Sequence, residues 1–177
     1  MNSIETLTQI LRESKNVVFF GGQNQYKTIH VPALEEPAFC LFDLNRQELS
    51  LDVLHNCACE IVADAGSWKG ETLAFLKKAG VVISSEEFRD PPGRDIFAIE
   101  ECADAKKAMT RGEKPVRLAD GEIPVASVTC VDSLAAGDIF HGAFCFACYQ
   151  KQYDFRAALT FASKIAAESV KYAGPRE

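Results

Sequence analysis

Residues 131–144 read VDSLAAGDIFHGAF, and this stretch decides both the fold and the function that we expect. The pattern predicts an apolar strand over Val128–Val131, a short loop of small residues, and a long apolar helix over Gly137–Gln150. A strand that turns this tightly into a helix aims unpaired backbone N–H groups and the positive end of the helix dipole at one point. The sequence therefore predicts an anion site at the start of this helix.

The small side chains of Ala135, Ala136 and Gly137 would let a phosphate group approach the backbone of the loop closely. Asp138 is unexpected here, because its carboxylate would repel a bound anion. Physical reasoning alone leaves two interpretations open. Asp138 is either an ordinary acid in the first turn of a helix, which is the commoner case, or a general base that accepts a proton from an attacking hydroxyl group.

Strands and helices alternate upstream of this stretch. We expect strands over Ala38–Leu44, Glu60–Asp64 and Val81–Ser84, and helices over Glu48–Cys57 and Thr72–Lys78. Strands that alternate with helices of this length indicate βαβ units, and hence an α/β fold with a mainly parallel sheet.

The remaining segments give further expectations. We expect a first helix from Ser3 to about Ser14, a strand over Val17–Phe20, a polar helix over Asp95–Ala108, a hairpin around Asp120-Gly121 and a last helix over Phe155–Lys171. Tyr26–Val31 forms either the partner of the first strand in a hairpin or a strand that belongs elsewhere, and the pattern does not separate the two.

The composition is that of one globular domain: 177 residues, 47% hydrophobic, with a formal net charge of −6. An acidic chain with scattered basic residues argues against nucleic acid as a partner. No long apolar run is present and the first residues lack the features of a signal peptide, so we expect a cytoplasmic protein without membrane segments.

The seven cysteines do not indicate a disulfide framework or a zinc site. Cys145 and Cys148 fall inside an apolar helix, where we expect buried thiols. His141 follows Asp138 by three residues, and we expect it to pack in the core rather than act as a base.

Residues 132–138, DSLAAGD, resemble the D-T-x-G-A-G-D signature of the ribokinase and phosphofructokinase-B (pfkB) family of carbohydrate kinases. The resemblance implies a ribokinase-like three-layer αβα fold that uses ATP and Mg²⁺, with a monovalent cation such as K⁺ near Asp132. It implies that Asp138 is the catalytic base and that the amides of Ala135, Ala136 and Gly137 form the anion hole. Ala135 replaces a residue that is glycine in most members.

Other segments are similar to the family in order and spacing. Thr110-Arg111-Gly112-Glu113 resembles the nucleotide loop T-x-G-x-x-G, with Pro115 in place of the second glycine, although residues 106–109 are more polar than the family's buried strand. The resemblance implies that the nucleotide contacts Thr110, Arg111, Gly112, Glu113, Ser133, Ser163 and Gly174. Glu87, three residues after Ser84, stands in for the acid of the N-x-x-E motif, which holds Mg²⁺ through water.

The resemblance covers about residues 39–174, and the sugar-binding half of the family has no recognisable counterpart. We therefore expect one incomplete kinase domain over residues 1–177, in which residues 38–177 match the nucleotide-binding half and residues 1–37 are unassigned. Two functions stay open. The chain is either an ATP-dependent kinase for a small sugar, or an inactive nucleotide-binding relic that acts as a binding module or is completed by a partner chain. Besides ATP and a small sugar, the expected partner is a second copy of the chain or a complementing chain.

Overall fold

The computed structural model describes residues 17–19, 39–44, 47, 51, 54–55, 58–150 and 152–173, and these form two compact units. The first unit comprises the described residues up to Val82 together with Phe88–Ala105, and the second comprises Ile83–Glu87 and the described residues from Lys106 onward. The helix expected at Ser3–Ser14 and the strand expected at Tyr26–Val31 lie outside the described residues.

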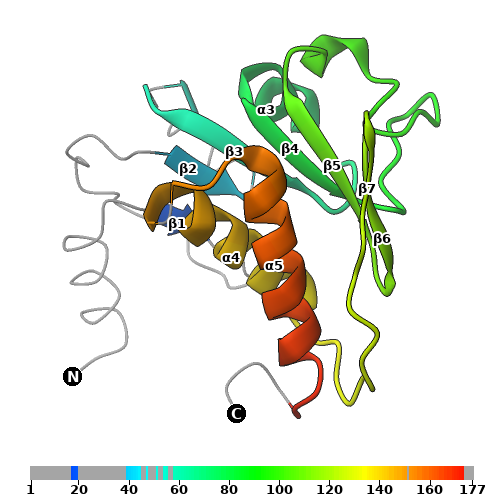
Figure 1. Ribbon diagram of the computed structural model, residues 1–177. Coiled ribbons are helices and arrows are strands. Elements are labelled where there is room, and N and C mark those ends of the chain that lie inside the picture. The colour runs from blue at the N-terminus through cyan, green and yellow to red at the C-terminus, as the bar shows by residue number, and fades with distance from the viewer. Residues whose placement is uncertain are drawn as a thin grey trace. The chain divides into compact units, whose positions relative to one another are not determined.

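Four strands form the sheet of the first unit, in the order β1-β2-β3-β4. They are β1 (Val17–Phe19), β2 (Phe39–Phe42), β3 (Glu60–Ala65) and β4 (Val81–Ser85), of which β4 continues into the second unit (Figure 1). β1 pairs with β2 and β2 with β3, both in parallel. All four residues of β2 are buried, as expected of a parallel strand that is covered on both faces.

The helix α3 (Thr72–Lys78) packs its apolar side against this sheet, because Phe75 and Leu76 are fully buried and the Phe75 ring lies 5.3 Å from that of Phe42. Its start is held by Gln47, which donates from Nε2 to Thr72 Oγ1 at 2.8 Å and accepts from the N–H of Glu71 at 2.7 Å. The described residues of the expected helix 48–57, which are Leu51, Leu54 and His55, are helical.

The prediction of a polar helix over Asp95–Ala108 is wrong. The Asp95 carboxylate accepts from the N–H groups of Phe97 at 3.0 Å and Ala98 at 3.2 Å, which stabilises a turn instead. A short 3₁₀ helix, η1 (Glu100–Cys102), follows. The chain then enters β5 (Lys106–Arg111), where the buried Ala108 and Met109 outweigh the polarity of the two lysines.

The sheet of the second unit has the order β4-β5-β6-β7, in which β6 (Lys114–Leu118) and β7 (Gly121–Ile123) continue from β5. β5 pairs with β6 and β6 with β7, both antiparallel, so the hairpin predicted around Asp120-Gly121 is confirmed. Gly112 closes the β5–β6 turn with φ +62°, a conformation that glycine adopts without steric cost.

Two helices complete the second unit and lie side by side (Figure 1): α4 (Ala136–Gln150) and α5 (Phe155–Ser169). The bounds of both helices agree to within two residues with those predicted from the sequence. Asp154 caps α5 by accepting from the N–H of Ala157 at 2.8 Å. Phe144 packs edge-on against Phe155, with ring centroids 5.8 Å apart.

The apolar strand expected over Val128–Val131 is wrong, because residues 124–131 form neither strand nor helix. The N–H groups of Val131 and Asp132 both donate to the carbonyl of Val170, at 2.7 and 3.2 Å. These two N–H groups therefore bond to the residue that caps the C-terminus of α5 and not to a neighbouring strand. Val131 itself is 62% exposed.

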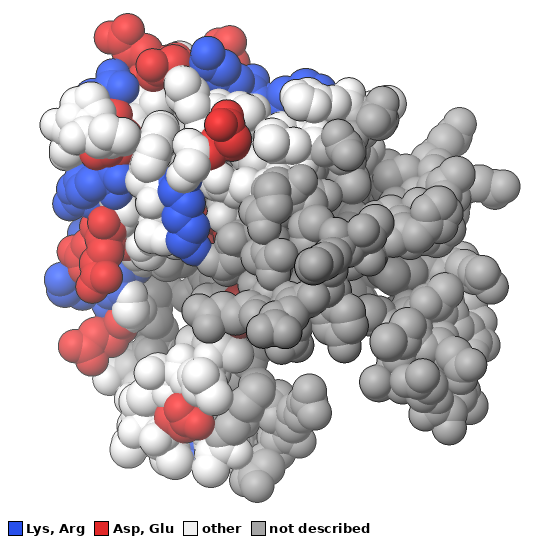
Figure 2. Space-filling model, turned by 180° about the vertical axis from the view of Figure 1, so that it is seen from behind, with Lys and Arg blue, Asp and Glu red and all other residues white. Residues whose placement is uncertain are grey.

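On the face seen in Figure 2, Lys and Arg lie among Asp and Glu, and the described residues there form no continuous basic surface of the kind that binds nucleic acid. Within the described ranges, no helix combines the length and the apolar character needed to span a bilayer.

Candidate functional site

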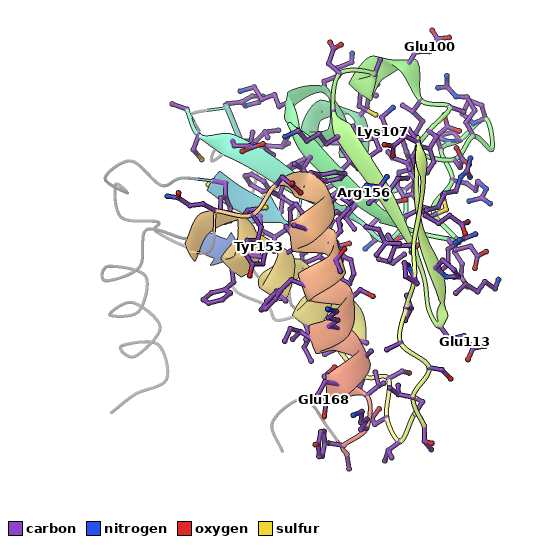
Figure 3. All side chains as sticks on the ribbon, in the orientation of Figure 1. Glu100, Lys107, Glu113, Tyr153, Arg156 and Glu168 are labelled. Atoms are coloured by element: carbon purple, nitrogen blue, oxygen red, sulfur yellow. The ribbon has the colours of Figure 1, made fainter. Side chains whose placement is uncertain are left out.

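A cavity of about 640 Å³ lies within the second unit. It is enclosed by the β5–β6 hairpin, the irregular segment 125–130, the start of α4 and the last turns of α5. Figure 3 shows Glu113 at the tip of this hairpin and Glu168 near the end of α5. The residues that line the cavity are Thr110, Gly112, Glu113, Lys114, Val116, Val125, Ala126, Ser127, Val128, Cys130, Ser133, Ala136, Phe140, Ser163, Ala166, Ala167 and Val170.

The bend into α4 borders this cavity through Ser133 and Ala136. Ala135 has φ +60°, a left-handed conformation that is rare outside glycine. A left-handed residue in a turn points successive N–H groups toward the same side, which forms a concave anion-binding nest. The chain therefore turns into α4 at Ala135, but it does so from an irregular segment and not from the strand that the sequence predicted.

Only part of the hydrogen-bonding capacity of this bend is used internally. The N–H of Ala136 donates to the carbonyl of Ser133 at 3.2 Å, and that of Ile139 donates to Ala135 at 2.9 Å. Within the described part of the chain, the N–H groups of Ala135, Gly137 and Asp138 have no hydrogen-bond acceptor. These are donors that a helix start leaves for a ligand or water.

The two acids of the signature occupy different positions. Asp138 lies in the first turn of α4 with an exposed side chain. Asp132 precedes the bend, and its Oδ1 accepts from the N–H of Leu134 at 2.8 Å, which holds the loop in its turn. Of the two acids, Asp138 is the more exposed to solvent.

Five residues of the predicted nucleotide set line the cavity: Thr110, Gly112, Glu113, Ser133 and Ser163. Arg111 does not line it. Its guanidinium donates to the carbonyl of Pro115 at 2.7 Å and to Glu122 at 2.6 Å, so it ties the hairpin to β7. Gly174 lies outside the described residues.

The end of β4 lies beside the nucleotide loop, since the Thr110 hydroxyl donates to the carbonyl of Ser84 at 3.2 Å. Glu87, the predicted metal-linked acid, is exposed two residues beyond this strand. No three His, Cys, Asp or Glu side chains converge among the residues that the structure describes.

His141 is 5% exposed, and its Nδ1 lies 2.7 Å from the carbonyl oxygen of Gly137. Because a carbonyl oxygen can only accept, Nδ1 carries the proton of this hydrogen bond. The ring also packs edge-on against Phe140, at 6.0 Å between centroids. This arrangement is that of a packing residue which braces the first turn of α4.

Sequence reasoning missed Lys114, which lines the cavity from the start of β6. The signal was its place immediately after Glu113, inside the loop already assigned to the nucleotide. It also missed the apolar residues of segment 125–130, since that segment was expected to form part of a strand.

The chain matches the model of the pfkB family of carbohydrate kinases over residues 14–177. A search of curated proteins finds no match. Among solved structures, ribokinase from Thermotoga maritima is similar with a TM-score of 0.65 and 22% identity, over 78% of this chain and 52% of that one. The nucleoside kinase from Methanocaldococcus jannaschii, a member of the ribokinase family, gives a TM-score of 0.67 and 18% identity, over 82% and 53%.

Aminoimidazole riboside kinase from Salmonella enterica, in complex with aminoimidazole riboside and an ATP analogue, gives a TM-score of 0.58 and 18% identity, over 77% of this chain and 57% of that one. The chain thus spans little more than half the length of these three kinases. The likeness confirms the ribokinase-like α/β fold that the sequence implies. The match over residues 14–177 shows that the chain belongs to the pfkB family of carbohydrate kinases.

Proposed function

We propose that this chain binds ATP in the cavity of the second unit and transfers its γ-phosphoryl group to a hydroxyl group of a small sugar. The observation that carries the proposal is the bend at Ala135, which leaves three N–H donors available beside a cavity lined by the nucleotide loop. Family membership supports the same chemistry, because pfkB proteins are carbohydrate kinases.

The phosphate chain lies at the start of α4 in this proposal. The N–H groups of Ala135 and Gly137 stabilise the charge on the transferred group, together with the positive end of the α4 dipole. The Ala136 N–H joins them when a phosphate oxygen replaces its weak 3.2 Å bond to Ser133. This arrangement forms the anion hole of the site.

Asp138 is the proposed base. Its exposed carboxylate, in the same first turn, accepts the proton of the attacking hydroxyl group as the new O–P bond forms, while the bond from the γ-phosphorus to the bridging oxygen breaks and ADP leaves. A carboxylate beside a bound phosphate raises the electrostatic free energy of the site, because the two negative charges repel each other. A residue with only a structural role would have no reason to carry that charge here. This cost supports a chemical role for Asp138.

The nucleotide is held by residues that line the cavity: Thr110, Gly112, Glu113, Ser133 and Ser163. Arg111 contributes indirectly, by fixing the hairpin through Pro115 and Glu122. Gly174, which lies outside the described residues, is assigned to the nucleotide by the family resemblance alone. The sugar-like substrate approaches Asp138 from the opposite side of the phosphate chain.

Glu87 is the residue that would hold Mg²⁺, through water, and the bound ion would supply charge neutralisation at the phosphates. Asp132 is the acid that we assign to a monovalent cation such as K⁺. We assign the protein to the cytoplasm.

We treat residues 1–177 as one kinase domain, whose sugar site is completed by a second copy or by a complementing chain. The second candidate function is an inactive nucleotide-binding module. The five residues of the predicted nucleotide set that line the cavity fit this function as well, because nucleotide binding alone requires no acceptor site.

A single experiment separates the two. Purified chain is incubated with MgATP and a panel of small sugars, ADP release is followed, and the mass in solution is measured in the same buffer. Sugar-dependent ADP release supports the kinase. Saturable ATP binding without ADP release for any sugar supports the binding module, and no ATP binding contradicts both.

A further inference from the structure

Lys114 is the only basic residue among the residues that line the described cavity. The sole other charged lining residue is Glu113, which precedes it in the same turn. A nucleoside triphosphate carries several negative charges, and a cation within reach of them contributes strongly to binding. Lys114 is therefore the lining residue whose positive charge suits contact with the phosphates.

In the ligand-free structure the Lys114 ammonium group has an anionic partner. Its Nζ lies 3.1 Å from both carboxylate oxygens of Glu86, a residue of the turn that follows β4. Both side chains are half exposed, at 59% for Lys114 and 43% for Glu86. An ion pair this open to water is weak and can exchange partners.

We propose that Lys114 contacts the phosphate chain of the bound nucleotide and that Glu86 competes with the phosphates for it. This inference rests on the proposed function, because it requires a nucleotide in the cavity. Glu86 holds the ammonium group at the loop when the cavity is empty, and phosphate oxygens replace the carboxylate on binding. The Glu86–Lys114 pair thus lowers the affinity for ATP and sets its dependence on the number of phosphates.

The competition predicts the direction in which each substitution changes the affinity for ATP. Glu86→Gln keeps the shape of the side chain but removes its charge, so Lys114 becomes available and ATP binds more tightly. Exposed ion pairs have small coupling energies, and the expected gain is about two- to fivefold in Kd. Lys114→Met removes the cation and weakens ATP binding by about tenfold, as for the loss of one charge-assisted hydrogen bond.

The test is a double-mutant cycle on the full chain with ATP, ADP and adenosine as probes, by titration calorimetry with and without Mg²⁺. We expect Glu86→Gln to tighten ATP more than ADP, to leave adenosine unchanged, and to have no effect in the Lys114→Met background. Asp120→Asn is the matched control, since Asp120 pairs with Arg156 at 3.0 Å and neither residue lines the cavity.

The inference is overturned if Glu86→Gln leaves ATP affinity unchanged or weakens it, or if its effect persists in the Lys114→Met background. Equal effects on ATP and adenosine would also overturn it, since the change would not act through phosphate. If the wild type binds no ATP, the proposed function fails and this inference fails with it. ATP binding without a response to Glu86→Gln removes the inference alone.

Discussion

The backbone N–H of Val131 donates to the carbonyl of Val170 at 2.7 Å. This bond joins the segment before the bend at Ala135 to the end of α5. The N–H of Asp132 adds a second bond to the same carbonyl at 3.2 Å. The position of the bend is therefore set by a helix that comes later in the chain. Its internal geometry is set by Ala135.

The left-handed conformation of Ala135 predicts that Ala135→Gly stabilises the protein. The conformation costs a non-glycine residue about 1–2 kcal/mol, and the greater flexibility of glycine in the unfolded chain offsets about 0.5–1 kcal/mol of the gain. We expect a higher urea midpoint. Ala143→Gly, inside α4, is the control and should destabilise by about 1 kcal/mol. Equal destabilisation by both variants would contradict the role assigned to φ at Ala135.

A larger side chain in the cavity should weaken nucleotide binding. Ala166 lies on α5 and lines the cavity, so Ala166→Leu should weaken ATP binding by tenfold or more, on the order of the loss of several contacts. Ala157→Leu makes the same change on the same helix, where the side chain lies outside this cavity. Fluorescence titration with an ATP analogue compares the two. Equal affinities would place the nucleotide elsewhere.

The ion pair of Asp90 with Arg94 predicts how stability depends on pH. Burial raises the pKa of Asp90, but the Arg94 side chain, at 2.7 Å from Oδ2, and the Arg94 N–H, at 2.6 Å from Oδ1, outweigh it and hold the pKa below its ordinary value of 3.8. A lowered pKa in the folded state adds stability above the unfolded value, and this stability is lost as the pH falls through the folded value.

Urea unfolding of the wild type should therefore show a midpoint that falls below pH 4, within the range set by the ordinary Asp90 value. Asp90→Asn should flatten this acid slope and lower the midpoint at neutral pH, because the Arg94 guanidinium loses its 2.7 Å ion pair and keeps only the 3.6 Å pair with Glu101. Arg94→Met should flatten the slope as well. An acid slope that is unchanged in both variants would show that other groups cause it.

The sequence was sufficient wherever local pattern and tertiary structure agree. Both helices of the second unit, the parallel pairing of β2 with β3 and the Asp120-Gly121 hairpin follow from periodicity and turn residues, whereas the pairing of β1 did not. It failed at Lys106–Arg111, because two lysines suggested a solvated helix, whereas Ala108 and Met109 are buried in a strand. Burial of two consecutive residues by partners distant in the sequence is not visible in local composition.

The candidate site was predictable in its residue types and less so in its contacts. The small residues before Asp138 indicated the bend, and Ala135 in a position usually held by glycine was a signal for its left-handed conformation. The role of Val170 and the pairing of Lys114 with Glu86 depend on segments 39 and 28 residues apart, which no local pattern links. The family resemblance implied a nucleotide contact for Arg111, whereas its guanidinium donates to the Pro115 carbonyl and to Glu122.

The base assignment predicts the effect of Asp138→Asn. Loss of a general base should reduce phosphoryl transfer by about 10²–10⁴-fold, with ATP affinity equal or slightly tighter because a negative charge is removed. Asp154→Asn, at the start of α5, is the control and should change neither quantity, since asparagine also caps helices. ADP release and calorimetry measure the two effects. Undiminished transfer by Asp138→Asn would exclude it as the base.

The most direct test of the account is the response of the backbone amides at the bend to ATP, observed by ¹⁵N–¹H NMR on the wild-type chain. If phosphate binds at the start of α4, the resonances of Ala135 and Gly137 shift downfield with saturable dependence on ATP, and adenosine does not reproduce the shift. If saturating ATP leaves these two amides unchanged while other residues respond, the phosphates do not bind at this bend and the proposed mechanism is wrong.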